Sequence, residues 1–402
     1  MRYMDVRKIK GYQIAQKKQI KEIKNGWLVK SQSGFGFYKV SEDFICDCPD
    51  SELHDATCKH AYAVRYYLDI EKNKPEGIKT EKIKLTYKQA WSVYNQAQTL
   101  EGQIFDELLR DLCLNLRINQ EPQLRGRPHT ILGDRIFVTI KKIYFQMSGR
   151  RAISLFKMAE EKKQITHTPH FNTVFNFLNS PKTTSILHEL IAITSAPLKA
   201  VETDFAVDST GFSTRCFGSY CEGKYPTNRE RKWLKLHACV GTKTHIISSV
   251  IVTGGNGADS PQLIPLAKNT SENGFDIEKL FADKGYLSKD NLDYIDQLGG
   301  TAYIPFKQNS LAKSRGSPIW RKMYFYFKMN QAEFMQNYNK RSNIESVFSA
   351  MKKKLGDTLK SKKHTAQINE LLCKVIAYNI MVLIEEMQEL GIAPNFNSKA
   401  LL

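Results

Sequence analysis

The feature that most constrains the fold is an alternation of strand-like and helix-like segments between residues 202 and 306. Three strand-like runs come first, FAVDSTGF, WLKLHACVG and HIISSVIVTGG. Helical segments then alternate with two more such runs, KLFADKGY and TAYIPF. Consecutive strands joined by turns pair antiparallel, whereas a helix between two strands allows them to pair parallel. The order of segments therefore predicts a mixed α/β sheet.

Two aspartates follow strand-like runs in this region. Asp208 comes after Phe-Ala-Val and Asp283 after Leu-Phe-Ala, and each lies close to a serine or a glycine. A carboxylate in such a place is expected to point into a crevice and away from the core. Either aspartate alone would more often be a turn former or a helix cap. The pair becomes informative only when a third carboxylate joins it.

That third carboxylate lies in residues 338–352, which contain neither proline nor glycine and are predicted to form one helix. Apolar residues recur there at helical spacing and would make one buried stripe: Ile344, Phe348, Met351 and Leu355. Four polar side chains are offset by three, four and seven residues: Tyr338, Arg341, Glu345 and Lys352. At about 100° per residue they fall within an arc of roughly 60° beside the stripe. Mixed charge on a helix usually marks a solvated face.

Asp208, Asp283 and Glu345 would supply three carboxylates from two strands and one helix. Hard oxygen ligands suit Mg²⁺ or Mn²⁺, and Mg²⁺ keeps open positions for phosphate oxygens and water. Two such ions about 4 Å apart would activate a water or a 3′-hydroxyl and stabilise the leaving oxygen. The sequence therefore predicts a two-metal phosphoryl-transfer site at these three residues.

The whole chain is strongly basic, with 59 Lys and Arg against 41 Asp and Glu and a net charge of +18. This balance predicts a polyanionic partner, with nucleic acid ahead of an acidic membrane. No apolar run approaches the ~20 residues of a membrane span, and the N-terminus lacks the apolar centre of a signal peptide. The protein is therefore expected in the cytoplasm, where its eight cysteines would be thiols or metal ligands.

Four candidate metal ligands have the spacing C-x-C-x9-C-x-H: Cys46, Cys48, Cys58 and His60. A predicted hairpin at 27–29 and 35–40 precedes them, and a helical pattern follows. Two close pairs of such donors suit tetrahedral Zn²⁺, and because side chains fill all four positions the zinc would be structural. The alternative is four unrelated residues. The stretch resembles the SWIM zinc finger, a family implicated in DNA or protein binding.

Four regions follow from these patterns: 1–70, a basic arm and small ββα zinc finger; 71–84, a polar linker; 85–200, a helical region with a predicted role in DNA binding; and 201–390, the α/β domain. In the helical region, Arg125 and Arg127 of RGRP are expected to bind DNA as a minor-groove hook, with a plain basic linker as the alternative. Residues 134–178 are predicted to hold two or three short helices, which suits a helix-turn-helix reader or any small bundle.

Residues 202–386 resemble insertion-sequence transposases of the DDE class, whose catalytic domain is ribonuclease-H-like. The resemblance is carried by Asp208 in FAVDSTGF, Asp283 in FADKGY and Glu345 in the helix. The family's Y-x2-R-x3-E-x6-K pattern is matched at all four positions, by Tyr338, Arg341, Glu345 and Lys352.

The resemblance implies that the chain binds the ends of a mobile element and catalyses strand cleavage and strand transfer, with the three carboxylates as catalytic metal ligands. Tyr338, Arg341 and Lys352 would bind phosphates and an extruded base at the element's end. It also implies double-stranded terminal-repeat and target DNA as partners, a homodimer in the DNA complex, and a prokaryotic-type, nucleoid-associated protein.

Two other functions remain open. A metal-dependent nuclease or resolvase would use the same carboxylates, but hydrolysis does not need the Tyr338, Arg341 and Lys352 row. A non-catalytic DNA-binding adaptor descended from a transposase would be expected to have lost a carboxylate, and none is missing.

Three further interpretations concern the surroundings of the site. Residues 307–330 are expected to hold little more than a loop or a hairpin. Trp320 within them is interpreted as a buried indole, with stacking on a flipped base as the alternative. Asp259 precedes Ser-Pro and is interpreted as a helix cap.

Overall fold

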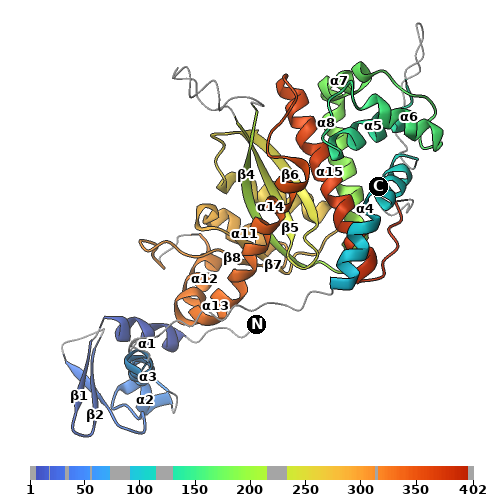
Figure 1. The fold of residues 1–402 in the computed structure, drawn as a ribbon. Helices are drawn as coiled ribbons and strands as arrows, with labels where there is room; N and C mark the ends of the chain where they lie inside the picture. The colour runs from blue at the N-terminus through green and yellow to red at the C-terminus, as the bar shows by residue number, and fades with distance from the viewer. Residues whose placement is uncertain are drawn as a thin grey trace, which may run out of the picture. The chain divides into compact units, whose positions relative to one another are not determined.

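The computed structural model describes residues 6–17, 19–31, 36–54, 57–72, 91–114, 130–214, 233–312 and 316–396 (Figure 1). The chain divides into two compact units, Met1–Tyr87 and Lys88–Leu402, and each is described by itself. Arg125 and Arg127, together with most of the linker predicted at 71–84, lie outside the described residues.

The first unit is a three-stranded sheet packed against helices. Its elements are α1 (Val6–Gln16), β1 (Ile20–Ile23), β2 (Gly26–Lys30), β3 (Phe37–Val40), α2 (Pro49–His54) and α3 (Lys59–Lys72). The strands pair antiparallel in the order β1-β2-β3. Ile14, Val29, Val40 and Val64 are completely buried and join α1 and α3 to the sheet. The predicted hairpin is confirmed as β2 and β3, while the basic arm adds a helix and a third strand.

Gly26 begins β2 in a conformation that requires glycine. Its φ is +124°, and a Cβ at this position would lie 2.1 Å from the carbonyl oxygen of Val40. A side chain would therefore separate the strands at the start of their pairing.

The second unit contains the predicted mixed sheet. Its strands are β4 (Asp204–Ser213), β5 (Trp233–Gly241), β6 (Ile247–Gly254), β7 (Lys279–Ala282) and β8 (Thr301–Tyr303). Their order is β6-β5-β4-β7-β8, with antiparallel pairing among the first three in sequence and parallel pairing of β4 with β7 and of β7 with β8. The sequence prediction of three consecutive strands followed by helix-linked strands is confirmed.

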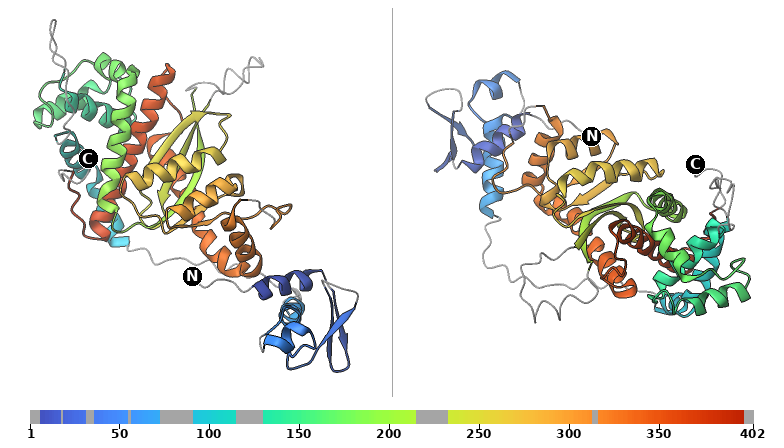
Figure 2. Two further views of the ribbon diagram at one scale, coloured as in Figure 1. Left: turned by 180° about the vertical axis from the view of Figure 1, so that it is seen from behind. Right: turned by 90° about the horizontal axis from the view of Figure 1, so that it is seen from above.

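Helices cover both faces of this sheet (Figure 2). On one face lie η2 (Ser260–Gln262), α10 (Leu263–Glu272) and α11 (Lys289–Gln297), and on the other lie α14 (Ser342–Leu355) and α15 (His364–Glu389). Alternate residues of β4 follow this division. Phe205 makes an edge contact with Phe275, which follows α10, whereas the Phe212 ring lies under Lys352 of α14 and Lys374 of α15.

The helices that precede the sheet pack around α15 and share its core. They are α4 (Trp91–Leu114), α5 (Leu132–Tyr144), α6 (Ile153–Glu161), α7 (Phe171–Asn179), α8 (Pro181–Ser195) and η1 (Ala196–Leu198). One hydrophobic cluster runs from α4 through the sheet to α15. Asn379 of α15 links these layers, because its side chain bonds to Thr194 of α8 and to both backbone groups of Ile247 in β6. The two or three short helices predicted within 134–178 are found as three, α5, α6 and α7.

Helix α15 is long and apolar enough to cross a membrane by length and composition. However, 94% of its most apolar window is buried inside the protein, as in the core helix of a globular unit.

The segment 307–330, predicted as a loop or a hairpin, contains the helix α12 (Pro318–Met329), and α13 (Gln331–Tyr338) follows it. Ser317 caps α12 by accepting a hydrogen bond from the Trp320 amide, and Pro318 occupies the first turn. The Trp320 indole donates to the carbonyl of Leu311 at 2.9 Å and packs edge-on against Phe306. The indole is half-buried, so the choice between a buried indole and a stacking surface stays a prediction.

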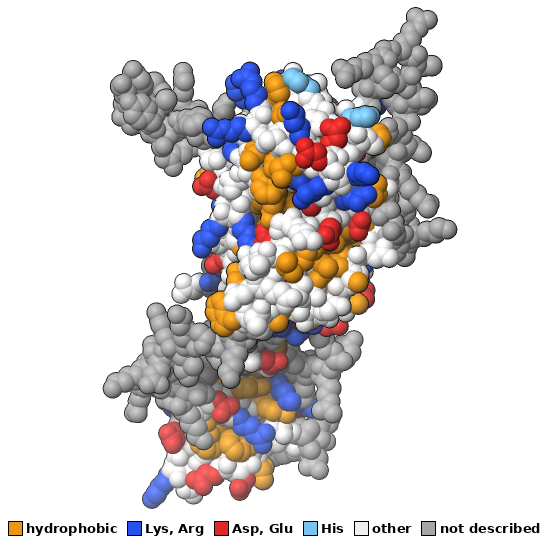
Figure 3. All heavy atoms as spheres, turned by 45° about the vertical axis from the view of Figure 1, so that its right-hand side comes forward, with side chains coloured by type: hydrophobic (Ala, Val, Ile, Leu, Met, Phe, Trp, Pro, Cys, Tyr) orange, Lys and Arg blue, Asp and Glu red, His pale blue; other side chains and the backbone are white. Residues whose placement is uncertain are grey.

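The basic charge is distributed over the surface. Figure 3 shows one face, on which Lys and Arg side chains lie between acidic and hydrophobic ones and do not form a single large patch.

Candidate active site

Asp208 and Asp283 lie next to each other where two parallel strands part. The last paired residues of β4 and β7 are Val207 and Ala282, and the two aspartates come directly after them. Neighbouring strands are about 4.8 Å apart. Asp283 ends its strand as predicted, but Asp208 does not, because β4 continues to Ser213 beside β5. β4 therefore extends past the end of β7.

Glu345 lies in the first turn of α14, on the sheet face toward which Asp208 points. The helix predicted over 338–352 is interrupted, because α13 ends at Tyr338 and a 3-10 turn, η4 (Asn339–Arg341), precedes α14. Backbone angles stay helical through the turn, so the chain changes its hydrogen bonding with little change of direction. The predicted apolar stripe is confirmed as buried: Ile344, Phe348, Met351 and Leu355.

Arg341 connects two of the three carboxylates. Its Nη1 donates to Asp208 Oδ2 at 2.8 Å and its Nη2 donates to Glu345 Oε1 at 2.6 Å. Burial raises the pKa of Asp208, the nearby charges of Asp283 and Glu345 act in the same direction, and Arg341 opposes them. The site therefore holds excess negative charge that a cation stabilises, and the guanidinium provides part of that positive charge.

Tyr338 and Lys352 lie on either side of this ion pair along the chain. The Tyr338 ring is 5.9 Å from the Arg341 guanidinium, and burial raises its pKa. Lys352 lies over the Phe212 ring at 5.3 Å, and burial lowers its pKa. The four side chains predicted to lie in a row therefore differ in their contacts. Arg341 contacts the carboxylates directly, whereas Tyr338 lies beside Arg341 and Lys352 lies over Phe212.

The three carboxylates do not converge on a single point. In the part of the chain that the structure describes, the group of three or more ligand atoms within 4.8 Å of one another is the cysteine–histidine cluster, not the acidic residues. Like charges repel without an intervening cation, and Arg341 stands between Asp208 and Glu345. The donor set itself, carboxylate oxygens beside a crevice, fits a hard divalent cation.

A polar cluster that was not predicted from the sequence lies on the opposite face of β4. Asp259, interpreted as a helix cap, precedes η2 but makes no side-chain cap hydrogen bond. It pairs instead with Lys235 Nζ at 2.6 Å and accepts a hydrogen bond from Ser209 at 2.9 Å. The alternation of Lys235 and His237 along β5 was the available signal, since both side chains point to the same face of the sheet.

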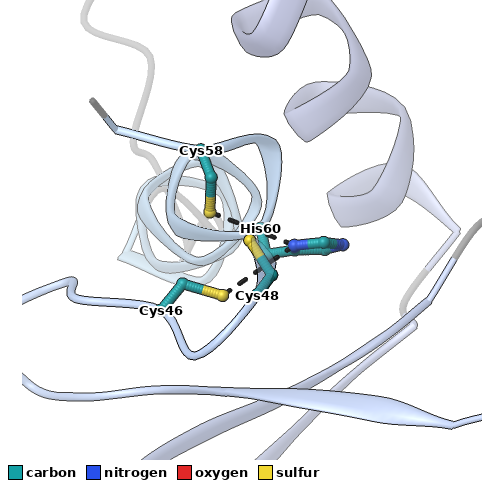
Figure 4. Close-up of side chains that lie close together, drawn as sticks. All are labelled: Cys46, Cys48, Cys58 and His60. Carbon is teal, nitrogen blue, oxygen red and sulfur yellow. Dashed lines mark hydrogen bonds between the residues drawn. The ribbon is translucent and has the colours of Figure 1, made fainter. Parts of the chain in front are cut away.

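The second candidate site lies in the first unit. Figure 4 shows the four side chains predicted as zinc ligands, all buried, with sulfurs that point toward one another: Cys46, Cys48, Cys58 and His60. The His60 Nδ1 atom is 3.8 Å from Cys46 Sγ and 3.9 Å from Cys58 Sγ. Cys46 forms an isolated bridge with Val40, and His60 is in the first turn of α3. Cys46 and Cys48 thus come from the segment between β3 and α2, and Cys58 and His60 come from the start of α3.

The three thiols are close enough that the pKa of each depends on its neighbours. A hydrogen bond between Cys46 and Cys58 is the largest cause of shift for both, raising the pKa of Cys46 and lowering that of Cys58 to about 3. A hydrogen bond with His60 also lowers the pKa of Cys58. Donors of this kind, within reach of one ion, fit Zn²⁺.

The mixed sheet of the second unit brings Asp208 and Asp283 to neighbouring strands, and Arg341 links Asp208 to Glu345. Residues 199–380, somewhat less than half of the chain, match the family model described as "Transposase DDE domain". The match supports a DDE-type transposase and an enzyme that cleaves and transfers DNA. A cryo-EM structure of a piggyBac transposase synaptic complex with hairpin DNA is similar at 11% identity, over 74% of this chain and 76% of that chain, with a TM-score of 0.35. That likeness is too distant to add to the argument.

Proposed function

We propose that the chain is a transposase that binds the ends of a mobile DNA element and performs strand cleavage and strand transfer at Asp208, Asp283 and Glu345. The observation that carries the proposal is the guanidinium of Arg341 bonded at once to Asp208 and Glu345. Two carboxylates from a strand and a helix are thereby held around one positive charge. A third, Asp283, lies on the adjacent strand end.

The carboxylates would hold two Mg²⁺ or Mn²⁺ ions, which supply activation of the attacking oxygen and stabilisation of the leaving oxygen when bound. The chain's own cationic side chains would orient the DNA. Arg341 can form a forked pair with a phosphate once it leaves the carboxylates. Lys352 adds a point charge about three helical turns further along α14. The half-buried Tyr338 ring offers a stacking surface for an unpaired base. The sheet would be ribonuclease-H-like, and DNA joining would use two copies of the chain.

The zinc cluster completes the proposal for the first unit. Cys46, Cys48, Cys58 and His60 would hold one structural Zn²⁺ in a SWIM-type module. Because all four ligands come from side chains, the ion would have no open position for a reacting water. Its role would be to fix the hairpin against α3.

The decisive experiment measures cleavage of a plasmid that carries the DNA flanking the coding region, with Mg²⁺. We expect Asp208→Asn, Asp283→Asn and Glu345→Gln each to reduce cleavage by about 10³-fold or more, because residues of one catalytic unit lose activity together. Glu272→Gln is the control, since this exposed carboxylate of α10 pairs with Lys268 away from the crevice. Parental cleavage by Glu345→Gln would refute the assignment.

The products separate the leading function from a nuclease. A transposase joins the excised ends to a second DNA, whereas a nuclease or resolvase leaves no joined product. The Arg341 contacts favour the transposase, because a positioned guanidinium beside the carboxylates serves a bound phosphodiester end and simple hydrolysis does not require it.

A further inference from the structure

A second polar cluster lies behind the proposed catalytic carboxylates. It is centred on Asp259, whose Oδ1 is 2.6 Å from Lys235 Nζ and accepts a hydrogen bond from Ser209 Oγ at 2.9 Å. His237 Nδ1 is 3.4 Å from the same oxygen, and its Nε2 is 2.9 Å from Thr253 Oγ1. One carboxylate oxygen thus has three polar neighbours from two adjacent strands.

Tyr286 lies against this cluster, and its hydroxyl makes no hydrogen bond of good geometry among the described residues. The side chain is only 2% exposed. Burial, and then the charges of Asp259 and Asp208, raise its pKa, while the nearby Ser209 hydroxyl lowers it, so the phenol keeps its proton and can donate. A buried donor without a well-placed acceptor is costly. Its charged neighbours are carboxylates, so the acceptor that completes its bonding is expected to be one of them or a group bound between them.

The cluster is connected by backbone to both aspartates of the crevice. Ser209 directly follows Asp208. Tyr286 closes the turn after Asp283, because its amide donates to the Asp283 carbonyl at 2.9 Å. The cluster therefore reaches one catalytic carboxylate through β4 and the other through η3 (Lys284–Tyr286).

Asn291 joins the segment that contains Asp259 to the turn that contains Asp283. Its side-chain amide donates to the carbonyl of Tyr286 at 2.7 Å and to the carbonyl of Ser260 at 3.1 Å. Asn291 is 2% exposed. The turn that carries Asp283 is thereby fixed to the segment that carries Asp259, and neither can shift without the other.

We propose that Asp259 and Tyr286 are positioning residues that set the spacing of Asp208 and Asp283 for a shared divalent cation. The Tyr286 hydroxyl donates to an oxygen of Asp208 or Asp283 when the cation draws the two carboxylates together, and Asp259 holds the Ser209 side of the crevice in place. Lys235 neutralises Asp259, so the added carboxylate does not increase the repulsion. The inference rests on the proposed function, since it assumes that these aspartates bind metal.

The test is the equilibrium affinity of the zinc-loaded full chain for Mn²⁺ without DNA, measured by calorimetry and by electron paramagnetic resonance. We expect Tyr286→Phe and Asp259→Asn each to weaken Mn²⁺ binding by 10- to 100-fold, as loss of outer-shell partners does in metal sites. The thermal midpoint without metal should change little for Tyr286→Phe, because the hydroxyl makes no hydrogen bond of good geometry among the described residues. Tyr378→Phe, a buried tyrosine of α15, is the matched control and should bind as the parent does.

Asp208→Asn separates the two claims. Suppose that Asp208→Asn abolishes Mn²⁺ binding, whereas Tyr286→Phe and Asp259→Asn leave the affinity unchanged. That result would overturn the positioning role and preserve the proposed function. Parental Mn²⁺ affinity in Asp208→Asn would overturn both, because the aspartates would then not be the metal ligands.

Discussion

Arg341 occupies the position where the acidic crevice most needs positive charge. Its two short hydrogen bonds join a strand carboxylate, Asp208, to a helix carboxylate, Glu345. A divalent cation would compete with the guanidinium for the same oxygens. The free protein is therefore held in a state in which Arg341 substitutes for the cation, and DNA phosphate offers Arg341 an alternative partner.

Arg341→Gln should consequently separate cation binding from DNA chemistry. Without DNA, we expect the variant to bind Mn²⁺ about three- to tenfold more tightly, because charge-assisted hydrogen bonds worth roughly 1–2 kcal/mol no longer oppose the ion. With DNA, cleavage should fall, because the phosphate loses its forked partner. Calorimetric titration of both proteins measures the first effect. An unchanged or weaker Mn²⁺ affinity would show that Arg341 does not occupy the cation's place.

Glu202 gives the fold a pH dependence that is independent of the crevice. It is fully buried at the start of β4, and burial raises its pKa from 4.5 to about 7, although the amides of Lys243 and Thr244 donate to it. A raised pKa in an acid means that the charged form is disfavoured in the folded state. Its stabilising contribution is complete below pH 4.5 and is lost as the pH rises to about 7.

We therefore expect the free energy of unfolding to fall by roughly 3 kcal/mol between pH 4.5 and 8 on account of this group. Glu202→Gln should remove that part of the pH dependence, whereas Glu272→Gln, on the exposed surface of α10, should retain it. Denaturant titrations at four or five pH values measure the effect. The same slope in Glu202→Gln and the parent would contradict the assignment.

Single residues differed in how well the sequence could place them. Asp208, Asp283 and Glu345 could be selected as candidates because each has an informative local context, a strand or a helical pattern. The partner of Asp259 could not be predicted, because Asp-Ser-Pro fits a helix cap equally well and Lys235 lies on β5, well before Asp259 in the sequence. A contact between residues that are distant in sequence leaves no periodic trace.

At the scale of elements, local periodicity was sufficient for the five strands of the second unit and for the helices that flank them. It failed at 318–329, where a loop or a hairpin was expected and α12 forms. Phe325 is buried there, as is Phe334 of α13, and Phe327 packs on both Phe306 and Phe334. The aromatic residues thus form a helical core, and tertiary packing decided between two structures that the local pattern allowed.

The first unit should depend on zinc in a way that the second does not. Cys58→Ser, or removal of zinc by a chelator, is expected to unfold residues 19–72, because this small unit has few buried apolar side chains besides the ligand cluster. The larger unit has its own core and should retain its transition. Calorimetry with zinc present should therefore show a transition that disappears in Cys58→Ser.

Cys113→Ser is the control for that experiment, because this partly buried cysteine belongs to α4 of the larger unit. It should lower only the transition that is insensitive to chelation. A single joint transition lost on chelation would contradict the independence of the two units.

At the scale of the whole molecule, the chain is two units of unequal size, Met1–Tyr87 and Lys88–Leu402. Composition and motifs could separate the zinc cluster from the sheet. They could not show that α4 to α8 share one core with the sheet, because that core is completed by α15 at the far end of the chain. Asn379, which bonds to both α8 and β6, illustrates a connection that only the folded chain reveals.

The net charge of +18 predicts how this molecule should respond to salt. Each phosphate that a lysine or arginine neutralises on duplex DNA adds about 0.9 to the slope of log affinity against log salt concentration. Lys352 is the best single test, because it follows Glu345 along α14 and its position is fixed over Phe212. Lys352→Gln should lower the magnitude of the slope by about 1 and weaken binding equally on different DNA sequences.

Lys268→Gln removes the same charge from α10, where the lysine pairs with Glu272 at 3.7 Å, and should leave the slope unchanged. Binding isotherms at salt concentrations from about 50 to about 300 mM would measure the slope for each variant. Equal slopes for Lys352→Gln and the parent would mean that DNA follows a different path across the molecule, even if the carboxylates are the catalytic residues.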